Sequence, residues 1–220
     1  MKKLITVASL SFLIASCSKN SSNTPVTTSP DTTPPALTLN GGVNDTVSLN
    51  SVYVDPGSTA VDAVDGNISA HIAVTGTINK DLVGEYRLYY NVKDAAGNAA
   101  AQLTRYVYVA NDADYLVGTY NAVQNCGASG TGNSTVTLSA STSVNNKISF
   151  GIPGNVALFA PNILVSGSSI SAPMQTSGPA SFSGSGTIAS NKKSFSFGFT
   201  AVSGNTFQGT WSCTNNYTKQ

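Results

Sequence analysis

Apolar and polar residues alternate most clearly between Glu85 and Lys93. Neighbouring residues of a β-strand point to opposite faces of the sheet, so this period of two predicts a half-buried strand. Shorter runs separated by turn residues flank it, at 36–39, 46–49, 52–54, 68–74 and 103–109. About seven short strands at this spacing predict a small β-sandwich.

The chain from Tyr115 onward carries a longer series of strand candidates joined by short turns. Such connections favour an antiparallel meander, which we expect to curl into a barrel, with a β-sandwich as the alternative. Phe195, Phe197 and Phe199 alternate with Ser or Gly, so they share one face and are core candidates. The strand candidates are 119–124, 134–140, 147–151, 156–159, 162–166, 169–174, 180–189, 194–202 and 206–214. The predicted fold class is therefore all-β, a β-sandwich followed by an antiparallel β-meander or barrel-like domain.

The first residues have the pattern of an export signal. Two lysines precede an apolar run over 4–14, which is shorter than the roughly 20 residues of a membrane span. The run ends in Leu13-Ile14-Ala15-Ser16-Cys17, which resembles the lipobox of bacterial lipoproteins. The resemblance implies cleavage before Cys17 and attachment of lipid to it, whereas the alternative is an ordinary signal peptide with an incidental cysteine. Ser18 rather than Asp follows the cysteine, and by resemblance to known sorting rules this favours an outer-membrane or cell-surface location.

The remainder of the chain consists of three parts that differ in composition and charge. Residues 18–34 contain almost nothing apolar to bury, so we expect a disordered linker. Residues 31–114 carry ten acidic and four basic side chains, whereas 115–220 carry four basic and no acidic ones. The expected organisation is a signal peptide over 1–16, the lipidated cysteine and linker over 17–34, a sandwich over 35–110 and the meander domain over 115–220. The basic excess is too dilute to predict nucleic-acid binding.

A set of short motifs in the first domain resembles a known family. Taken together, they resemble the Ig-like domain of bacterial surface proteins, related to the HYR group. The resemblance implies an immunoglobulin-like sandwich with a role in presentation or adhesion, and it implies no enzyme. Gly118-Thr119-Tyr120 and Gly209-Thr210-Trp211 in the second domain resemble lipocalin-like meanders. The family motifs are Pro34-Pro35-x-Leu37-x-Leu39, Tyr53-x-Asp55-Pro56-Gly57, Ala60-x-Asp62-x-x-Asp65-Gly66, Gly84-x-Tyr86, Asp94-Ala95-Ala96-Gly97-Asn98 and Arg105-x-Val107-x-Val109.

The three cysteines fit an exported protein. Once Cys17 is assigned to lipid, Cys126 and Cys213 remain as a pair, and an oxidising compartment favours a disulfide between them. The bond would close a loop of about 86 residues and contribute roughly 4 kcal/mol in the chain-entropy model. Because bridged Cα atoms lie within about 7 Å, the first and last strands of the second domain should be neighbours.

The sequence offers little catalytic chemistry. His71 is the single histidine, and the motifs of zinc proteases, nucleophile-elbow hydrolases and P-loop proteins are absent. The second domain has no acidic residue, so it cannot supply the paired carboxylates of a glycosidase. We therefore expect no enzyme and no cofactor.

Four aspartates beside turns of the first domain are candidate calcium ligands, namely Asp55, Asp62, Asp65 and Asp94. If two of these turns meet at one end of the sandwich, their carboxylate oxygens would suit calcium. The alternative is that Asp-Gly and Asp-Pro simply form good turns.

Two classes of function remain. We expect a non-enzymatic lipoprotein, held to the membrane by its lipid, whose Ig-like spacer presents the C-terminal domain to an extracellular protein or glycan. The alternative is a module that binds a glycan or a small apolar ligand. A barrel filled by its own Phe side chains would argue against the small ligand, whereas a planar row of exposed aromatic residues would favour the glycan. The candidate aromatic residues are Tyr53, Tyr89, Tyr106, Tyr108 and Trp211, although strands also favour Tyr and Trp as simple cover for the sheets.

Asp31-Thr32-Thr33 and Asp45-Thr46-Val47 resemble the Asp-Ser/Thr-x sites of bacterial O-glycosylation. We predict a glycan on Thr32 or Thr46 of the exported protein, detectable as a mass increment on their peptides. Unmodified peptides covering both residues would remove this hypothesis.

Overall fold

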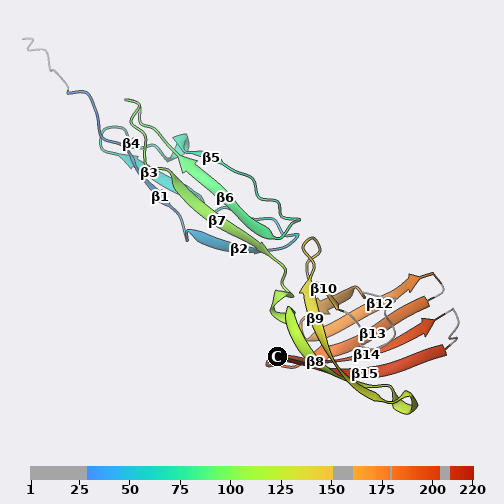
Figure 1. The fold of residues 1–220 in the computed structure, drawn as a ribbon. Helices are drawn as coiled ribbons and strands as arrows, with labels where there is room; N and C mark the ends of the chain where they lie inside the picture. Colours follow the sequence, from blue (N-terminus) through green and yellow to red (C-terminus); the bar gives the residue numbers. More distant parts are fainter. Residues whose placement is uncertain (1–28, 151–160, 179, 204–208) are drawn as a thin grey trace, which may run out of the picture. The chain divides into compact units, whose positions relative to one another are not determined.

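The computed structural model describes residues 29–150, 161–178, 180–203 and 209–220, and its fold is all-β as predicted. Seven strands between residues 36 and 110 form two sheets, and eight strands between 118 and 219 form a closed barrel (Figure 1). Among the described residues, no helix has the length and apolar character required to cross a membrane.

The sandwich has one three-stranded and one four-stranded sheet. The smaller sheet has the order β1 (Ala36–Leu39), β3 (Ser58–Asp62) and β4 (Gly66–Asn67). The larger sheet has the order β2 (Asn44–Ser48), β7 (Leu103–Ala110), β6 (Gly84–Asn91) and β5 (Ala73–Thr75). Strands β2 and β7 are parallel, whereas the other paired strands of both sheets are antiparallel.

The strand predicted over 68–74 is wrong in its first part, where the chain forms the 3₁₀ turn η1 (Ser69–His71). The Asn67 Oδ1 atom accepts a hydrogen bond from the Ser69 amide at 3.0 Å. The Ser69 hydroxyl in turn accepts one from the Ala60 amide at 2.9 Å. Such side-chain bonds compete with the ladder of a sheet, which explains why the apolar run did not become one strand.

The alternate residues of β6 and β7 that point inward form the core of the sandwich, as the sequence predicted. Leu88, Tyr90, Val107 and Val109 are buried, while their neighbours in sequence lie on the outer face or at its margin. Arg105 occupies one of the inward positions and is completely buried. The core of the sandwich therefore contains a charge that the period of two alone would not place there.

The second domain is a barrel of eight antiparallel strands in sequence order, which decides between the two predicted alternatives. Each strand pairs with the next in the chain, and β15 pairs with β8 to close the ring. The predicted strand at 156–159 lies outside the described residues. The short turns η2 (Asp114–Leu116) and η3 (Gly127–Ser129) precede and follow the first strand. The strands are β8 (Gly118–Asn125), β9 (Thr131–Ala140), β10 (Lys147–Phe150), β11 (Ile163–Ser166), β12 (Ser169–Ser177), β13 (Ala180–Ile188), β14 (Ser194–Ser203) and β15 (Gly209–Lys219).

Aromatic rings fill the interior of the barrel at the level of the described strands. Phe195, Phe197 and Phe199 of β14 are buried, as their shared face predicted. The ring of Phe195 stacks on that of Tyr217 with 4.3 Å between centroids, and Phe150 makes edge contacts with both rings. Such contacts contribute beyond the burial of their area, so these rings add directly to the stability of the barrel.

Two glycines of β13 make room for this packing. A Cβ atom on Gly184 would lie 2.6 Å from the Phe197 ring. A Cβ atom on Gly186 would collide with the Ser196 carbonyl oxygen and would lie 2.8 Å from the Phe197 Cα atom. Glycine at these positions therefore allows β13 and β14 to approach each other around the buried ring.

The expected disulfide joins Cys126 to Cys213, with 4.1 Å between the two Cα atoms. Cys126 directly follows β8, and Cys213 lies in β15, next to the pair formed by Thr214 and Asn125. The disulfide therefore connects the first and last parts of the domain at the place where β8 and β15 pair.

We predict that Gly186→Ala lowers the free energy of unfolding of the barrel by about 1–3 kcal/mol, because the new methyl group has no space. Gly132→Ala is a matched control, since a Cβ atom there meets nothing within 4 Å. Urea unfolding of the two variants measures the difference. An equal effect of both substitutions would contradict the steric explanation.

Candidate functional site

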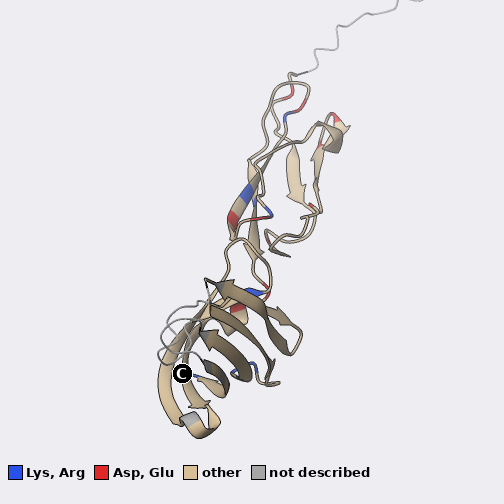
Figure 2. Ribbon diagram, turned by 90° about the vertical axis from the view of Figure 1, so that its right-hand side faces the viewer, with Lys and Arg blue, Asp and Glu red and all other residues tan. Residues whose placement is uncertain are grey.

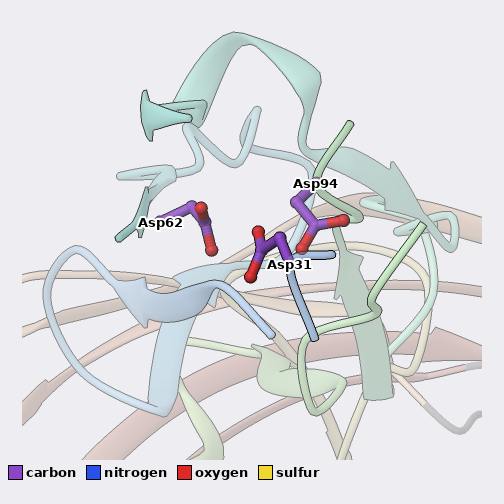
Figure 3. Close-up of side chains that lie close together, drawn as sticks. All are labelled: Asp31, Asp62 and Asp94. Carbon is purple, nitrogen blue, oxygen red and sulfur yellow. The ribbon is translucent and has the colours of Figure 1, made fainter. Parts of the chain in front are cut away.

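Three carboxylates converge at one place on the sandwich. Asp62 is the last residue of β3, Asp94 follows β6, and Asp31 precedes β1. One oxygen atom of each lies within 4.8 Å of those of the other two (Figure 3). Asp62 and Asp94 are buried, with 4% and 8% exposure. Charged side chains are rarely buried together without compensation, so the cluster is the first candidate for a binding site.

The turn after β3 sets the orientation of Asp62. Its Oδ1 atom accepts hydrogen bonds from the amides of Asp65 and Val64, at 2.9 and 2.8 Å. These amide bonds lower the pKa of the Asp62 carboxyl below its usual range, so it is ionised at neutral pH. Its Oδ2 atom is also buried and has no hydrogen-bond partner among the described residues.

The loop after β6 holds Asp94 in a similar way. Its Oδ1 atom accepts a hydrogen bond from the Asn98 amide, and its Oδ2 atom accepts one from the Asn98 side chain, both at 2.7 Å. The Ala95 amide donates to the Asp65 Oδ2 atom at 2.7 Å, which connects this loop to the loop after β3. The cluster consists of carboxylate oxygens without nitrogen or sulfur donors, a chemistry that suits hard cations such as calcium or magnesium.

The structure brings together two of the four aspartates proposed as calcium ligands. Asp62 and Asp94 belong to the cluster, and Asp65 lies beside it but uses an oxygen to accept the Ala95 amide. Asp55 lies elsewhere, with Tyr90 and Arg105. Asp31 was missed because the polar stretch over 18–34 indicated only a linker. A usable signal was its place just before Pro34-Pro35, where the first strand is about to begin.

Asp55 belongs to a polar cluster around the buried Arg105. The Arg105 Nε atom lies 3.5 Å from the Asp55 Oδ1 atom. The Arg105 Nη2 atom donates to the carbonyls of Asn40 and Gly57, at 2.7 and 3.0 Å. The Tyr90 hydroxyl donates to Asp55 at 2.8 Å, and burial together with this bond raises the pKa of Tyr90 to about 12. Arg105 thus has one acidic partner and two carbonyl acceptors, while its buried Nε and Nη1 atoms have no hydrogen-bond partner among the described residues.

The remaining predicted residues are dispersed. His71 is exposed at the end of η1 and belongs to no group of three or more potential metal ligands among the described residues. Thr32 and Thr46 are both exposed. Cys17 and the side chain of Trp211 lie outside the described residues.

Three of the predicted surface tyrosines share the outer face of the larger sheet. Tyr89 lies on β6, and Tyr106 and Tyr108 lie on β7. Arg87, paired with Tyr106 across the two strands, places its guanidinium 5.2 Å from the centre of the Tyr106 ring. Tyr53 is separate, with its hydroxyl donating to Asp45 at 3.0 Å. Tyr108 is exposed, whereas Tyr89 and Tyr106 are half-buried, so this face meets the requirement of the glycan alternative only in part.

Charge is distributed unequally between the domains. Acidic side chains lie in the sandwich and in the segment that leads into the barrel, whereas the strands of the barrel carry none (Figure 2). The described barrel therefore contains no pair of carboxylates for acid–base chemistry.

Comparisons with known proteins agree with the fold of the first domain. Residues 37–109 match the family described as "Bacterial surface protein, Ig-like domain". This part of the chain is an Ig-like domain of that type, as the sequence motifs implied, and it fits an exported surface protein. The crystal structure of a lipoprotein from Bacteroides thetaiotaomicron shows similarity at 13% identity with a TM-score of 0.35, covering 84% of this chain and 100% of that chain. A comparison with the curated proteins gives no match.

We predict that Arg105→Met lowers the free energy of unfolding by about 3 kcal/mol, because it leaves Asp55 without its cation and two carbonyls without a donor. Arg87→Met is the matched control. Arg87 pairs with Glu85 on the surface, and both side chains are more than one-third exposed, so its loss should lower the free energy of unfolding much less than the loss of Arg105. Denaturant unfolding separates the two variants, and equal destabilisation would show that burial of Arg105 has no special importance.

Proposed function

We propose that the chain is a non-enzymatic lipoprotein of the bacterial surface, in which the Ig-like domain is a spacer and the barrel is the part that meets a partner. The N-terminal motif ending in Cys17 supports attachment through lipid. The match of residues 37–109 to an Ig-like domain of bacterial surface proteins supports the role of the first domain. The proposed location is the outer membrane, with the chain held there by its lipid.

The observation that carries this proposal is the aromatic packing inside the barrel. Phe150, Phe182, Phe195, Phe197 and Tyr217 are buried against one another, and this packing disfavours a small apolar ligand among the described strands. A partner would therefore meet the outer surface. Across β13, β14 and β15 this surface is rich in small hydroxyl side chains, which line a shallow hollow that includes Ser185, Thr200, Ser212 and Thr214.

A glycan-binding module is the second candidate. The observation that favours it is the group Tyr89, Tyr106 and Tyr108 on one sheet face, with Arg87 beside Tyr106. Sugar rings stack on exposed aromatic faces, and hydroxyl groups find a charged donor in arginine. In this alternative the first domain binds and is more than a spacer.

We predict that Cys17→Ala prevents incorporation of labelled palmitate into the chain in cells, because it removes the attachment sulfur. The partner is then sought with the mature chain without lipid, on a glycan array and against purified surface extracts. A barrel variant (Thr200→Arg with Ser212→Arg) should reduce binding at least tenfold by obstructing the hollow.

A sheet-face variant (Tyr106→Ala with Tyr108→Ala) is the matched control and should bind normally. The reverse result, with binding lost only in the sheet-face variant, would replace the proposal with the glycan alternative. Palmitate labelling that persists in Cys17→Ala would remove the anchor from the proposal.

A further inference from the structure

Asp62 and Asp94 lie on either side of Asp31 in Figure 3, and a hydrogen bond from the Ala95 amide to Asp65 connects the two loops that carry them. Neither aspartate forms an ion pair with a described lysine or arginine, whereas Asp55, Asp81 and Glu85 each do. Like charges this close repel each other, and the repulsion grows when the groups are removed from water. The sandwich therefore brings two negative charges together. No described lysine or arginine forms an ion pair with either Asp62 or Asp94.

A second observation points to a ligand at this place. The Asp62 Oδ2 atom is buried and has no hydrogen-bond partner among the described residues, and Asp62 belongs to the group whose carboxylate oxygens lie within 4.8 Å of one another. The other oxygen of the same carboxyl accepts two amide hydrogen bonds, so the orientation of the group is determined by the turn. A carboxylate oxygen buried in this way requires a partner, which is either a hydrogen-bond donor or a cation. Because no described donor reaches it, a cation is a suitable partner.

From these observations we infer that Asp31, Asp62 and Asp94 bind a calcium ion. Calcium takes oxygen ligands at about 2.3–2.6 Å in flexible arrangements, so two ligands of one ion can lie up to about 5 Å apart. The carboxylate oxygens of the cluster are separated by at most 4.8 Å, which allows all three to reach the same ion. Magnesium is less suitable, because it demands near-ideal octahedral geometry at about 2.0–2.1 Å.

Bound calcium would add a connection between the loop after β3 and the loop after β6, which one hydrogen bond already joins. Calcium sites of extracellular modules bind with dissociation constants of about 10⁻⁴–10⁻³ M. An exported domain with such a site would be stabilised by millimolar calcium outside the cell and would lack that stabilisation at the low calcium concentrations inside it. The site is independent of the partner proposed for the barrel.

The test uses the complete mature chain, first treated with EDTA and then titrated with calcium chloride in a calorimeter. We expect one site per chain and an increase of the melting temperature of the sandwich by a few degrees at about 10 mM calcium. Asp62→Asn and Asp94→Asn should each weaken calcium binding at least tenfold. Both substitutions keep a side-chain oxygen that can accept the amide hydrogen bonds of the turn, so the circular dichroism spectrum in EDTA should remain that of the wild type.

Asp114→Asn is the matched control, since it removes the same charge from an exposed residue outside the cluster, and it should bind calcium normally. The inference is overturned if the wild-type chain shows neither binding heat nor a melting shift at 10 mM calcium. It is equally overturned if Asp62→Asn and Asp94→Asn, folded by circular dichroism, bind as the wild type does. Magnesium chloride titrated in the same way should bind at least tenfold more weakly, and equal affinity would contradict the assignment to calcium.

Discussion

Closure of the barrel through β8 and β15 is the constraint on which the second domain depends. A closed ring of eight strands has an interior that side chains can fill or that can hold one small ligand. Large rings on β10, β13, β14 and β15 occupy that space, and glycines on β13 allow the neighbouring strand to approach. The disulfide between Cys126 and Cys213 also connects the chain where β8 and β15 meet. Because aromatic rings pack together between the described strands, we propose the outer surface as the place where a partner binds.

The sandwich depends on a different constraint, namely how its buried charged side chains are compensated. Arg105 lies in the core, where it forms an ion pair with Asp55 and donates hydrogen bonds to two carbonyls. Asp62 and Asp94 are also buried, yet their local partners are amide and side-chain N–H donors without a positive charge. Aspartates of similar sequence context therefore have two roles. Asp55 pairs with the buried Arg105, whereas Asp62 and Asp94 leave negative charge that a cation can neutralise.

Much of the fold could be predicted from local patterns. The alternation at 85–93 became β6, and the three phenylalanines of β14 became core, because a period of two is a property of the strand itself. The run at 68–74 was misread, because hydrogen bonds of Asn67 and Ser69 compete with a strand and leave no trace in the hydrophobic pattern. Two of the three residues in the carboxylate cluster were identified, since the side chains that flank a turn are visible in the sequence but their distances from other turns are not.

The sequence by itself determined the all-β class and the order of the two β-domains, because these depend on composition and periodicity. It also predicted the pairing of Cys126 with Cys213, once Cys17 was assigned to lipid. Only the tertiary structure decided that the second domain is a closed barrel, since closure depends on which strands become neighbours after folding. The same holds for the carboxylates. Asp31, Asp62 and Asp94 are about 30 residues apart along the chain, and only the packing of separate loops brings their oxygens within 4.8 Å.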